Sequence, residues 1–195
     1  MPLFIATALI LFTSACHKGQ RTDTTQLDNI GMSFSAIEEL RKLDITNVEV
    51  PDLTKAKQAG MTDDGCIAIV KIYHDRNRPF DAGDAVAGLA QAGVKESTVL
   101  ELARLDQMNF WGEAQAMRLA RLSDEIILEL ARHRAAGKPE LSGASLAELK
   151  NEGFSEALLL ELARRGVPDD QKSTLITFRR RGWNDRQILE HFPAS

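Results

Sequence analysis

Five acidic side chains recur at one position of a repeating pattern, and carboxylates can act as general acids or bases or as metal ligands. Each acid lies three residues after a reference position that is glycine in four copies and arginine in one. The acids are Asp63, Glu96, Asp124, Glu156 and Asp185, and the reference residues are Gly60, Gly93, Arg121, Gly153 and Gly182. A carboxylate in the first turn of a helix also interacts favourably with the positive end of the helix dipole. We therefore predict that these acids begin helices and do not form a catalytic or metal site.

The residues directly before the acids support this interpretation. Thr62, Ser123, Ser155 and Asn184 are good N-caps, whereas Lys95 departs from the pattern. Glycine at the reference position suits the left-handed conformation that ends many helices. We expect the one copy with arginine at this position to end its helix in another way.

The remaining reactive side chains form no recognised motif. The four histidines, His17, His74, His133 and His191, occur singly, and no Walker, G-x-S-x-G or H-E-x-x-H pattern is present. The segment His74-Asp75-Arg76 follows an expected helix and precedes Pro79, which favours a solvated loop. The sequence thus predicts no catalytic residue, no metal site and no cofactor.

Apolar residues at constant offsets define the elements that carry the acids. Residues one position after the reference are apolar in all five copies, as are those four and seven before it and six, seven and ten after it. Spacings of three and four residues are typical of amphipathic helices, so each copy predicts two helices joined by a short turn. The reference positions lie 28 to 33 residues apart, which is typical of helical repeats that stack on their neighbours.

An incomplete copy precedes these five. Gly31-Met32-Ser33 matches the turn, but Phe34 and Glu38 replace the acid and an apolar residue, so we predict a half-unit whose helix caps the array. The expected fold class is all-α, with tandem helix-turn-helix repeats forming a short α-solenoid or compact helical array over residues 31–195. Its turns are expected near residues 31, 60, 93, 121, 153 and 182.

The first complete copy resembles a known motif. Residues 45–50 read Ile-Thr-Asn-Val-Glu-Val, and Leu53 and the segment Ala59-Gly60-Met61-Thr62-Asp63-Asp64 follow. This is similar to a helical-hairpin motif of bacterial envelope lipoproteins and signalling proteins, I-T-N-x-D-V, then L, then A-G-h-S-D-E, where h is hydrophobic. Residues 45–70 match well and later copies loosely, with Glu49 for Asp and an added Pro51 as departures. The resemblance implies no enzyme, cofactor or known ligand.

The first sixteen residues are typical of an export signal. They contain no charged side chain, and an apolar run from Leu3 to Phe12 ends in Thr13-Ser14-Ala15-Cys16. This run is too short to span a bilayer, which needs about 20 residues. Residues 1–15 are therefore predicted to be a signal peptide, and Cys16 resembles the lipidated cysteine of a bacterial lipobox, although Thr13 stands where leucine is usual.

The predicted lipid would hold the chain at a membrane of the cell envelope. His17 after the cysteine, in place of Asp, resembles the signal for the outer membrane. Residues 16–30 are polar beyond Cys16 and predict a flexible tether. The alternative is cleavage after Ala15 by ordinary signal peptidase, which would give a soluble secreted or periplasmic protein. In that case a disulfide between Cys16 and Cys66 would be open to the chain, although a buried cysteine usually acts as a small hydrophobic residue.

The charge of the chain argues against nucleic acid as a partner. The formal net charge is −4, and the acidic chain carries an export signal, so its helix-turn-helix units are not expected to bind DNA.

Two segments could form an interaction surface. Phe110 and Trp111 follow Asn109 in a loop, where they either wedge adjacent hairpins together or form exposed aromatic anchors. Residues 164–186 hold seven basic and three acidic side chains, including the run Arg179-Arg180-Arg181. These arginines either complement the negative end of a helix or bind a membrane surface or an acidic wall polymer.

These features predict a non-catalytic protein- or peptide-binding or scaffolding module tethered to a membrane by its N-terminal lipid. The alternative is a structural lipoprotein that binds the cell wall or membrane surface through its basic C-terminal end. An enzyme with an unrecognised site is the third alternative.

Overall fold

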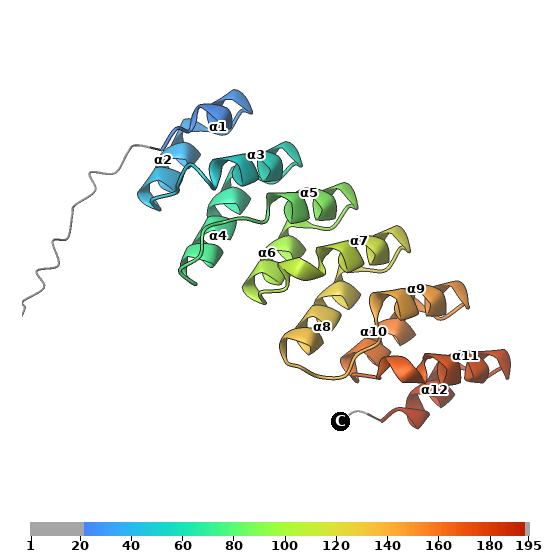
Figure 1. Ribbon diagram of the computed structural model, residues 1–195. Coiled ribbons are helices and arrows are strands. Elements are labelled where there is room, and N and C mark those ends of the chain that lie inside the picture. The colour runs from blue at the N-terminus through green and yellow to red at the C-terminus, as the bar shows by residue number, and fades with distance from the viewer. Residues whose placement is uncertain (1–21, 194–195) are drawn as a thin grey trace, which may run out of the picture.

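The computed structural model describes residues 22–193, which form six consecutive helical hairpins without a β-strand (Figure 1). The first helices of the hairpins are α1 (Thr25–Asn29), α3 (Val50–Gln58), α5 (Gly83–Gln91), α7 (Trp111–Leu119), α9 (Gly143–Asn151) and α11 (Lys172–Arg180). The second helices are α2 (Phe34–Lys42), α4 (Asp63–His74), α6 (Glu96–Arg104), α8 (Asp124–Ala135), α10 (Glu156–Arg164) and α12 (Asp185–His191). Short 3₁₀ turns, η1 (Met108–Phe110) and η2 (Asp169–Gln171), precede α7 and α11.

The hairpins, numbered 1 to 6 along the chain, stack into two layers. Odd-numbered helices pack on odd-numbered helices, as in α3 on α5 and α7 on α9, and even-numbered helices pack on even-numbered ones. Each hairpin contacts mainly the hairpins before and after it, so the array follows the order of the sequence from blue to red in Figure 1. The predicted all-α array of tandem hairpins is confirmed.

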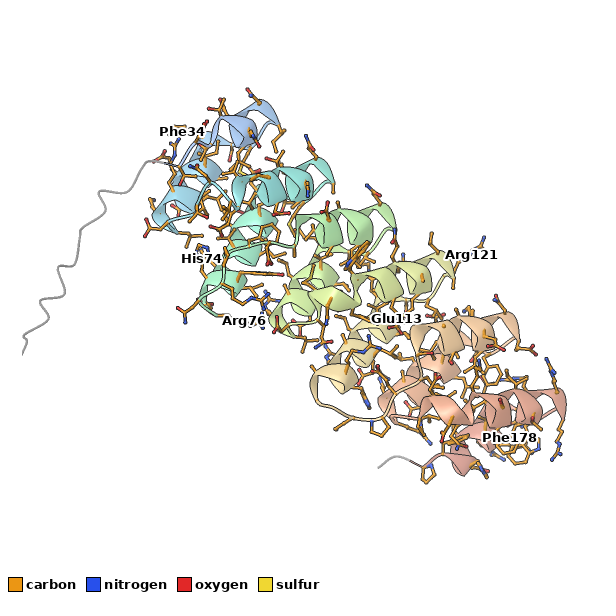
Figure 2. All side chains as sticks on the ribbon, in the orientation of Figure 1. Phe34, His74, Arg76, Glu113, Arg121 and Phe178 are labelled. Atoms are coloured by element: carbon orange, nitrogen blue, oxygen red, sulfur yellow. The ribbon has the colours of Figure 1, made fainter. Side chains whose placement is uncertain are left out.

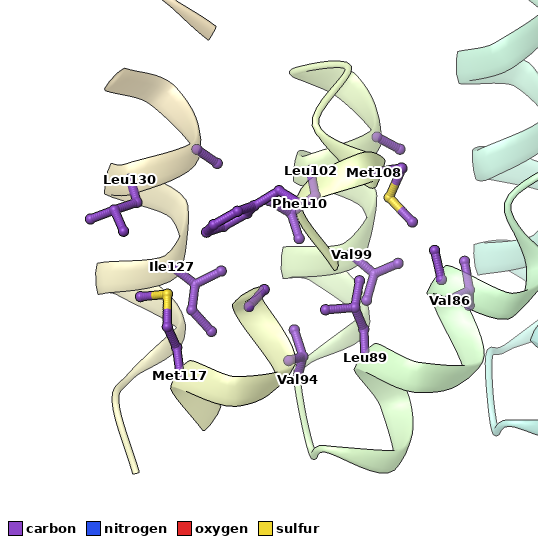
Figure 3. Close-up of a cluster of buried hydrophobic side chains, with 14 of the residues drawn as sticks. Val86, Leu89, Val94, Val99, Leu102, Met108, Phe110, Met117, Ile127 and Leu130 are labelled. Atoms are coloured by element: carbon purple, nitrogen blue, oxygen red, sulfur yellow. The ribbon is translucent and has the colours of Figure 1, made fainter. Parts of the chain in front are cut away.

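Residues at the predicted offsets fill the core between hairpins. The first-helix positions Leu53, Val86, Leu89 and Met117 are at most 1% exposed. Figure 3 shows how such residues of hairpins 3 and 4 interlock with residues from the second helices. In those second helices the offset of +6 is buried, as predicted, but +7 is only partly buried. The offset of +9, which was not predicted, supplies the fully buried residues Ile69, Leu102, Leu130 and Leu162.

The repeat array begins earlier than predicted. The copy around Gly31 is a complete hairpin, because α1 forms within the segment expected to be a flexible tether. Leu27 lies four residues before Gly31, at the same offset as Leu89 and Met117, and it is fully buried. This single apolar anchor was overlooked because the surrounding residues are polar. Residues 16–21 of the predicted tether lie outside the described residues.

All six turns between paired helices have the same backbone geometry. The reference residues all have positive φ, including Gly31 at +79° and Arg121 at +63°. In every copy the next N–H donates to a carbonyl five residues back, as in Met32 to Leu27 at 3.1 Å and Leu122 to Met117 at 3.0 Å. This is the Schellman hydrogen bond that satisfies a free helix-end carbonyl. The expectation that Arg121 would end its helix differently is wrong.

Replacing Arg121 by glycine should stabilise the protein. Arg121 is exposed at the turn after α7 (Figure 2), so its side chain has little packing to lose. A left-handed conformation costs an L-residue about 1 kcal/mol that glycine does not incur. We expect the free energy of unfolding of Arg121→Gly to rise by about 1 kcal/mol in urea denaturation. Arg121→Ala, which keeps the strain, should show no such gain, and an equal gain in both variants would contradict the explanation.

Candidate binding surfaces

The five recurring acids link neighbouring hairpins. Each begins the second helix of its own hairpin, as predicted, but its carboxylate also accepts a hydrogen bond from the preceding hairpin. Glu96 accepts from the N–H and hydroxyl of Thr62 at 2.6 and 2.8 Å, and Asp63 accepts from the N–H of Ser33 at 3.0 Å. The other three bonds run from Lys95 N to Asp124, from Ser123 N to Glu156 and from Ser155 Oγ to Asp185. The acids therefore form a ladder that joins all six hairpins along one edge.

Basic residues three positions before the reference complete this ladder. Lys57 lies 2.6 Å from Asp63, Lys150 lies 2.7 Å from Glu156, and Arg118 and Arg179 pair in the same way with Asp124 and Asp185. Among the five copies that carry the acid, only the copy at Gly93 lacks such a base, because Ala90 occupies the position. Sequence reasoning missed this column of bases, although the alignment that gave the acids contains it.

The two ends of the ladder differ from its interior. Phe34 holds the position of the acid in hairpin 1, where the described residues provide no preceding hairpin, and it is 76% exposed. At the other end, the N–H of Asn184 has no following acid and donates to its own Gln187 at 2.9 Å in a capping box.

Three of the predicted N-caps, Thr62, Ser155 and Asn184, accept side-chain capping bonds, but Ser123 does not, and nothing in the structure explains this difference.

The ladder should make stability depend on pH. Hydrogen bonds and charge from Lys57, together with hydrogen bonds from Ser33, lower the pKa of Asp63 to about 2. A lowered folded-state pKa contributes stability above the unfolded value of about 3.9, and this contribution is lost as pH falls towards 2. At pH 6 the free energy of unfolding of Asp63→Asn should therefore be about 1–2 kcal/mol lower than that of the parent, after allowance for partial exposure.

The control for this prediction is the same comparison in acid. Near pH 2 the Asp63 carboxyl is about half protonated in the folded state and almost fully protonated in the unfolded state, so most of its contribution is lost and the parent and Asp63→Asn should differ by less than about 0.5 kcal/mol in urea unfolding. A difference of equal size at pH 6 and near pH 2 would show that the stabilisation does not come from the ionised carboxylate.

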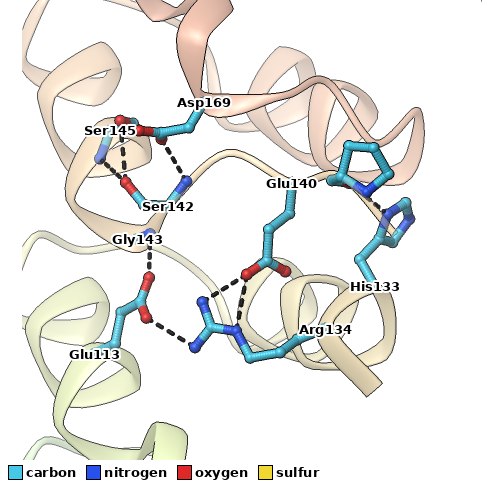
Figure 4. A network of polar contacts seen from close by, with 9 residues as sticks. Glu113, His133, Arg134, Glu140, Ser142, Gly143, Ser145 and Asp169 are labelled. Atoms are coloured by element: carbon cyan, nitrogen blue, oxygen red, sulfur yellow. Dashed lines mark hydrogen bonds and ion pairs between the residues drawn. The ribbon is translucent and has the colours of Figure 1, made fainter. Parts of the chain in front are cut away.

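Of the two predicted aromatic anchors, only Trp111 reaches the surface. Phe110 is 2% exposed, and the guanidinium of Arg134 lies 4.5 Å from its ring centre. Figure 4 shows that Arg134 of α8 also joins Glu113 of α7 to Glu140 in the loop before α9. Phe110 is thus a wedge between hairpins, and its assignment to an interaction surface is wrong. Trp111 is 36% exposed.

The basic run near the C-terminus is largely paired inside the protein. Arg179 bonds to Asp185 at 2.5 Å and lies over the ring of Phe154, and Arg180 bonds to Glu152 at 2.7 Å. Arg181 is exposed and forms no ion pair with another described residue. The three arginines therefore do not offer three free charges to a polymer.

The predicted solvated loop at His74 is wrong. His74 ends α4, and its Nε2 lies 2.7 Å from Oε1 of Glu49, a carboxylate that is only 1% exposed. Arg76 donates to the carbonyls of Ala103 and Arg104 at the end of α6. Of these two residues, labelled in Figure 2, His74 joins the two helices of hairpin 2, and Arg76 ties hairpin 2 to hairpin 3.

Cys16 and His17 lie outside the described residues. Cys66 is fully buried, and burial raises the pKa of its thiol to about 12, so it packs as a small hydrophobic residue. Between residues 22 and 193, no three His, Cys, Asp or Glu side chains are grouped as a metal ion would require. No helix of that segment has the length and apolar character needed to cross a bilayer.

Sequence reasoning also missed a repeated surface on the even-numbered layer. Residues 100–104, 128–132 and 160–164 all read Leu-Glu-Leu-Ala-Arg. The inner Leu-Ala pair of each is buried, but the first leucine, the glutamate and the arginine remain partly or fully exposed. We call these nine residues the Leu-Glu-Arg strip: Leu100, Glu101 and Arg104 of α6, Leu128, Glu129 and Arg132 of α8, and Leu160, Glu161 and Arg164 of α10.

The three leucines of this strip pack against the core and are partly buried, whereas the three arginines are exposed. Arg104 bonds to Glu101 at 3.2 Å and Arg132 to Glu129 at 3.3 Å, but exposed pairs of this kind contribute little stability. Because α8 packs on both α6 and α10, the three sets lie side by side across the layer. The strip therefore presents one pattern of apolar, acidic and basic groups three times in succession.

Comparison with models of protein families, with curated proteins and with solved structures finds no match to this chain.

Proposed function

We propose that this chain is a non-catalytic module that binds another protein or peptide in the bacterial cell envelope, where a lipid on Cys16 holds it to a membrane. The observation that carries the binding role is the Leu-Glu-Arg strip. Stacked helical repeats offer extended surfaces to their partners. Three adjacent helices present the same residue types at the surface, with exposed arginines beside partly exposed leucines and glutamates, which suits an extended or helical segment that makes a similar contact at each step.

The anchor is supported by the sequence of the first sixteen residues and by the resemblance to envelope lipoproteins. Its test is membrane fractionation with intact mass measurement of the native protein. The proposal expects an acylated chain in the membrane fraction and release of Cys16→Ser into the soluble fraction. An unmodified parent chain in the soluble fraction would contradict the anchor and leave the binding role to be judged separately.

The binding role is tested by photo-crosslinking from the strip in cells that express the protein. A photoreactive amino acid at the exposed Ser97 of α6 stands one turn before Glu101, next to the strip. We expect a covalent adduct with one envelope polypeptide. The triple variant Arg104→Glu, Arg132→Glu and Arg164→Glu should abolish this adduct, because it reverses the charge at every step of the strip.

A matched variant controls for the change in net charge. Lys95→Glu, Lys138→Glu and Arg186→Glu alter charge by the same amount at exposed positions outside the strip. This control should keep the adduct. Equal loss in both triple variants, or no polypeptide adduct at all, would overturn the strip as a binding surface. Sedimentation with purified peptidoglycan that is lost on neutralising Arg181 would support the structural wall-binding alternative.

A further inference from the structure

Trp111 stands at a cleft that only the stacked array creates. The cleft has a volume of about 270 Å³ and is open to solvent. Its walls come from three successive hairpins: the end of α4 with the loop that follows it, the first turn of α5, and the η1 turn with the start of α7. The side chains that carry its chemistry are Tyr73, Arg78, Asp81, Asp84, Asn109 and Trp111. The cleft lies near the first helices of hairpins 3 and 4, whereas the Leu-Glu-Arg strip belongs to the second helices.

The indole of Trp111 is held against the backbone of α5. A Cβ atom on Gly88 would lie 2.6 Å from the indole ring, so only glycine lets the ring come so close to this helix. The neighbouring Phe110, at the end of η1, is buried and holds the start of α7 against the core. Trp111 is therefore held in place while 36% of its surface stays accessible to a ligand.

The charge that the cleft offers to a ligand is negative. Arg78 is already paired within the protein, because it forms an ion pair with Asp106 at 3.2 Å and its guanidinium lies 5.5 Å from the centre of the Tyr73 ring. Asp84 is paired with Lys55 at 2.8 Å. Asp81, by contrast, is exposed and forms no ion pair or hydrogen bond with another residue of the described chain. An unpaired carboxylate thus stands in the same cleft as an accessible indole.

These groups suit a cation of limited size. An ammonium or guanidinium group is attracted to the electron-rich face of an indole, and a carboxylate nearby adds to this attraction. Small-molecule sites usually enclose about 300–1,000 Å³, whereas this open cleft is smaller and accommodates a single side chain. We propose that the cleft binds the lysine or arginine side chain of a partner polypeptide, with Trp111 and Asp81 as the contacting residues. The inference rests on the proposed function in that it takes the partner to be a polypeptide.

The test uses the fluorescence of Trp111 in the full chain. The sequence has two tryptophans, so Trp183→Phe leaves Trp111 as the only reporter. The probe is a blocked peptide, Gly-Gly-Lys-Gly-Gly, and its comparison is the same peptide with uncharged norleucine in place of lysine. We expect a saturable change in emission with the lysine peptide that weakens as salt is added, and none with the norleucine peptide.

Asp81→Asn should lower the affinity for the lysine peptide about fivefold, whereas Asp64→Asn should leave this affinity unchanged. Asp64 is an exposed acid outside the cleft and controls for general attraction between the acidic chain and a basic peptide. Equal responses to both peptides, or an Asp81→Asn variant that binds the lysine peptide as the parent does, would overturn the proposal. Because the probe is synthetic, this result is independent of whether the strip yields an adduct in cells.

Discussion

Gly83→Ala should lower the free energy of unfolding by about 3 kcal/mol and the melting temperature by about 10 °C. Gly83 begins α5 and lies directly against Asp52 in the first turn of α3. A Cβ atom at this position would lie 2.5 Å from the carbonyl oxygen of Asp52 and 2.6 Å from its Cα. Backbone atoms cannot rotate away as a side chain can, so the two helices must separate. The hydrogen bond from Gly83 N to Asp52 Oδ1, 3.1 Å long, should be lost as well.

Two other glycines provide matched controls for this variant. Gly143 begins α9 in the same way, but its Cβ would meet only the side chains of Glu113 and Met117, at 2.8 Å. These side chains can move, so Gly143→Ala should cost only about 1 kcal/mol. Gly112 has no atom within 4 Å of its Cβ position, and Gly112→Ala should stabilise α7 by about 0.5–1 kcal/mol. Similar losses in Gly83→Ala and Gly143→Ala, measured by thermal and urea unfolding, would contradict the backbone clash.

Glu49→Gln should destabilise the protein by about 2–3 kcal/mol, because a buried carboxylate that accepts four hydrogen bonds is replaced by an amide with one acceptor. Oε1 of Glu49 accepts from Phe80 N at 2.9 Å and contacts His74 Nε2 at 2.7 Å. Oε2 accepts from the N–H and hydroxyl of Thr46 at 2.8 and 2.9 Å. Burial opposes ionisation, but the hydrogen bonds from Phe80 and Thr46 outweigh it and lower the pKa of Glu49.

The control for Glu49 is an acid that is paired at the surface. Glu38 forms an ion pair with Arg41 within α2, and 39% of its side chain is exposed. Glu38→Gln should change the free energy of unfolding by less than about 0.5 kcal/mol. An equally small change in the free energy of unfolding of Glu49→Gln in urea denaturation would contradict this explanation. It would show that the buried hydrogen bonds of Glu49 do not hold the start of hairpin 2 to the loop before α5.

Features that depend on local chemistry were predictable from the sequence. The reference glycines indicated left-handed turns because the required conformation belongs to the residue itself. The offsets of apolar residues indicated the hairpins because helical periodicity determines which side chains share a face. The same local reasoning failed at Arg121, where the surrounding Schellman bond imposes on arginine the conformation that glycine adopts readily.

Features that depend on stacking were not predictable. The acids were correctly placed at the starts of helices, but their bonds to the preceding hairpin follow from how one hairpin sits on the next. Phe110 and Trp111 are adjacent in sequence, yet the η1 turn directs the first into the core and leaves the second at the surface. Glu49 was noted only as a departure from the motif, because two of the three residues that bond to it, His74 and Phe80, lie 25 and 31 residues away.

The two-layer array also implies that the chain does not open uniformly. In hairpin 6, α11 buries only Leu175 and α12 only Ile188, whereas α8 in the interior buries Ile126, Ile127, Leu130, Ala131 and His133. Because each hairpin is stabilised mainly by the residues that it buries against its neighbours, hairpin 6, which buries the fewer of the two, unfolds before the hairpin that contains α8. Amide hydrogens should therefore exchange with solvent faster in α11 and α12 than around α8, so that deuterium uptake records the position of each hairpin in the stack.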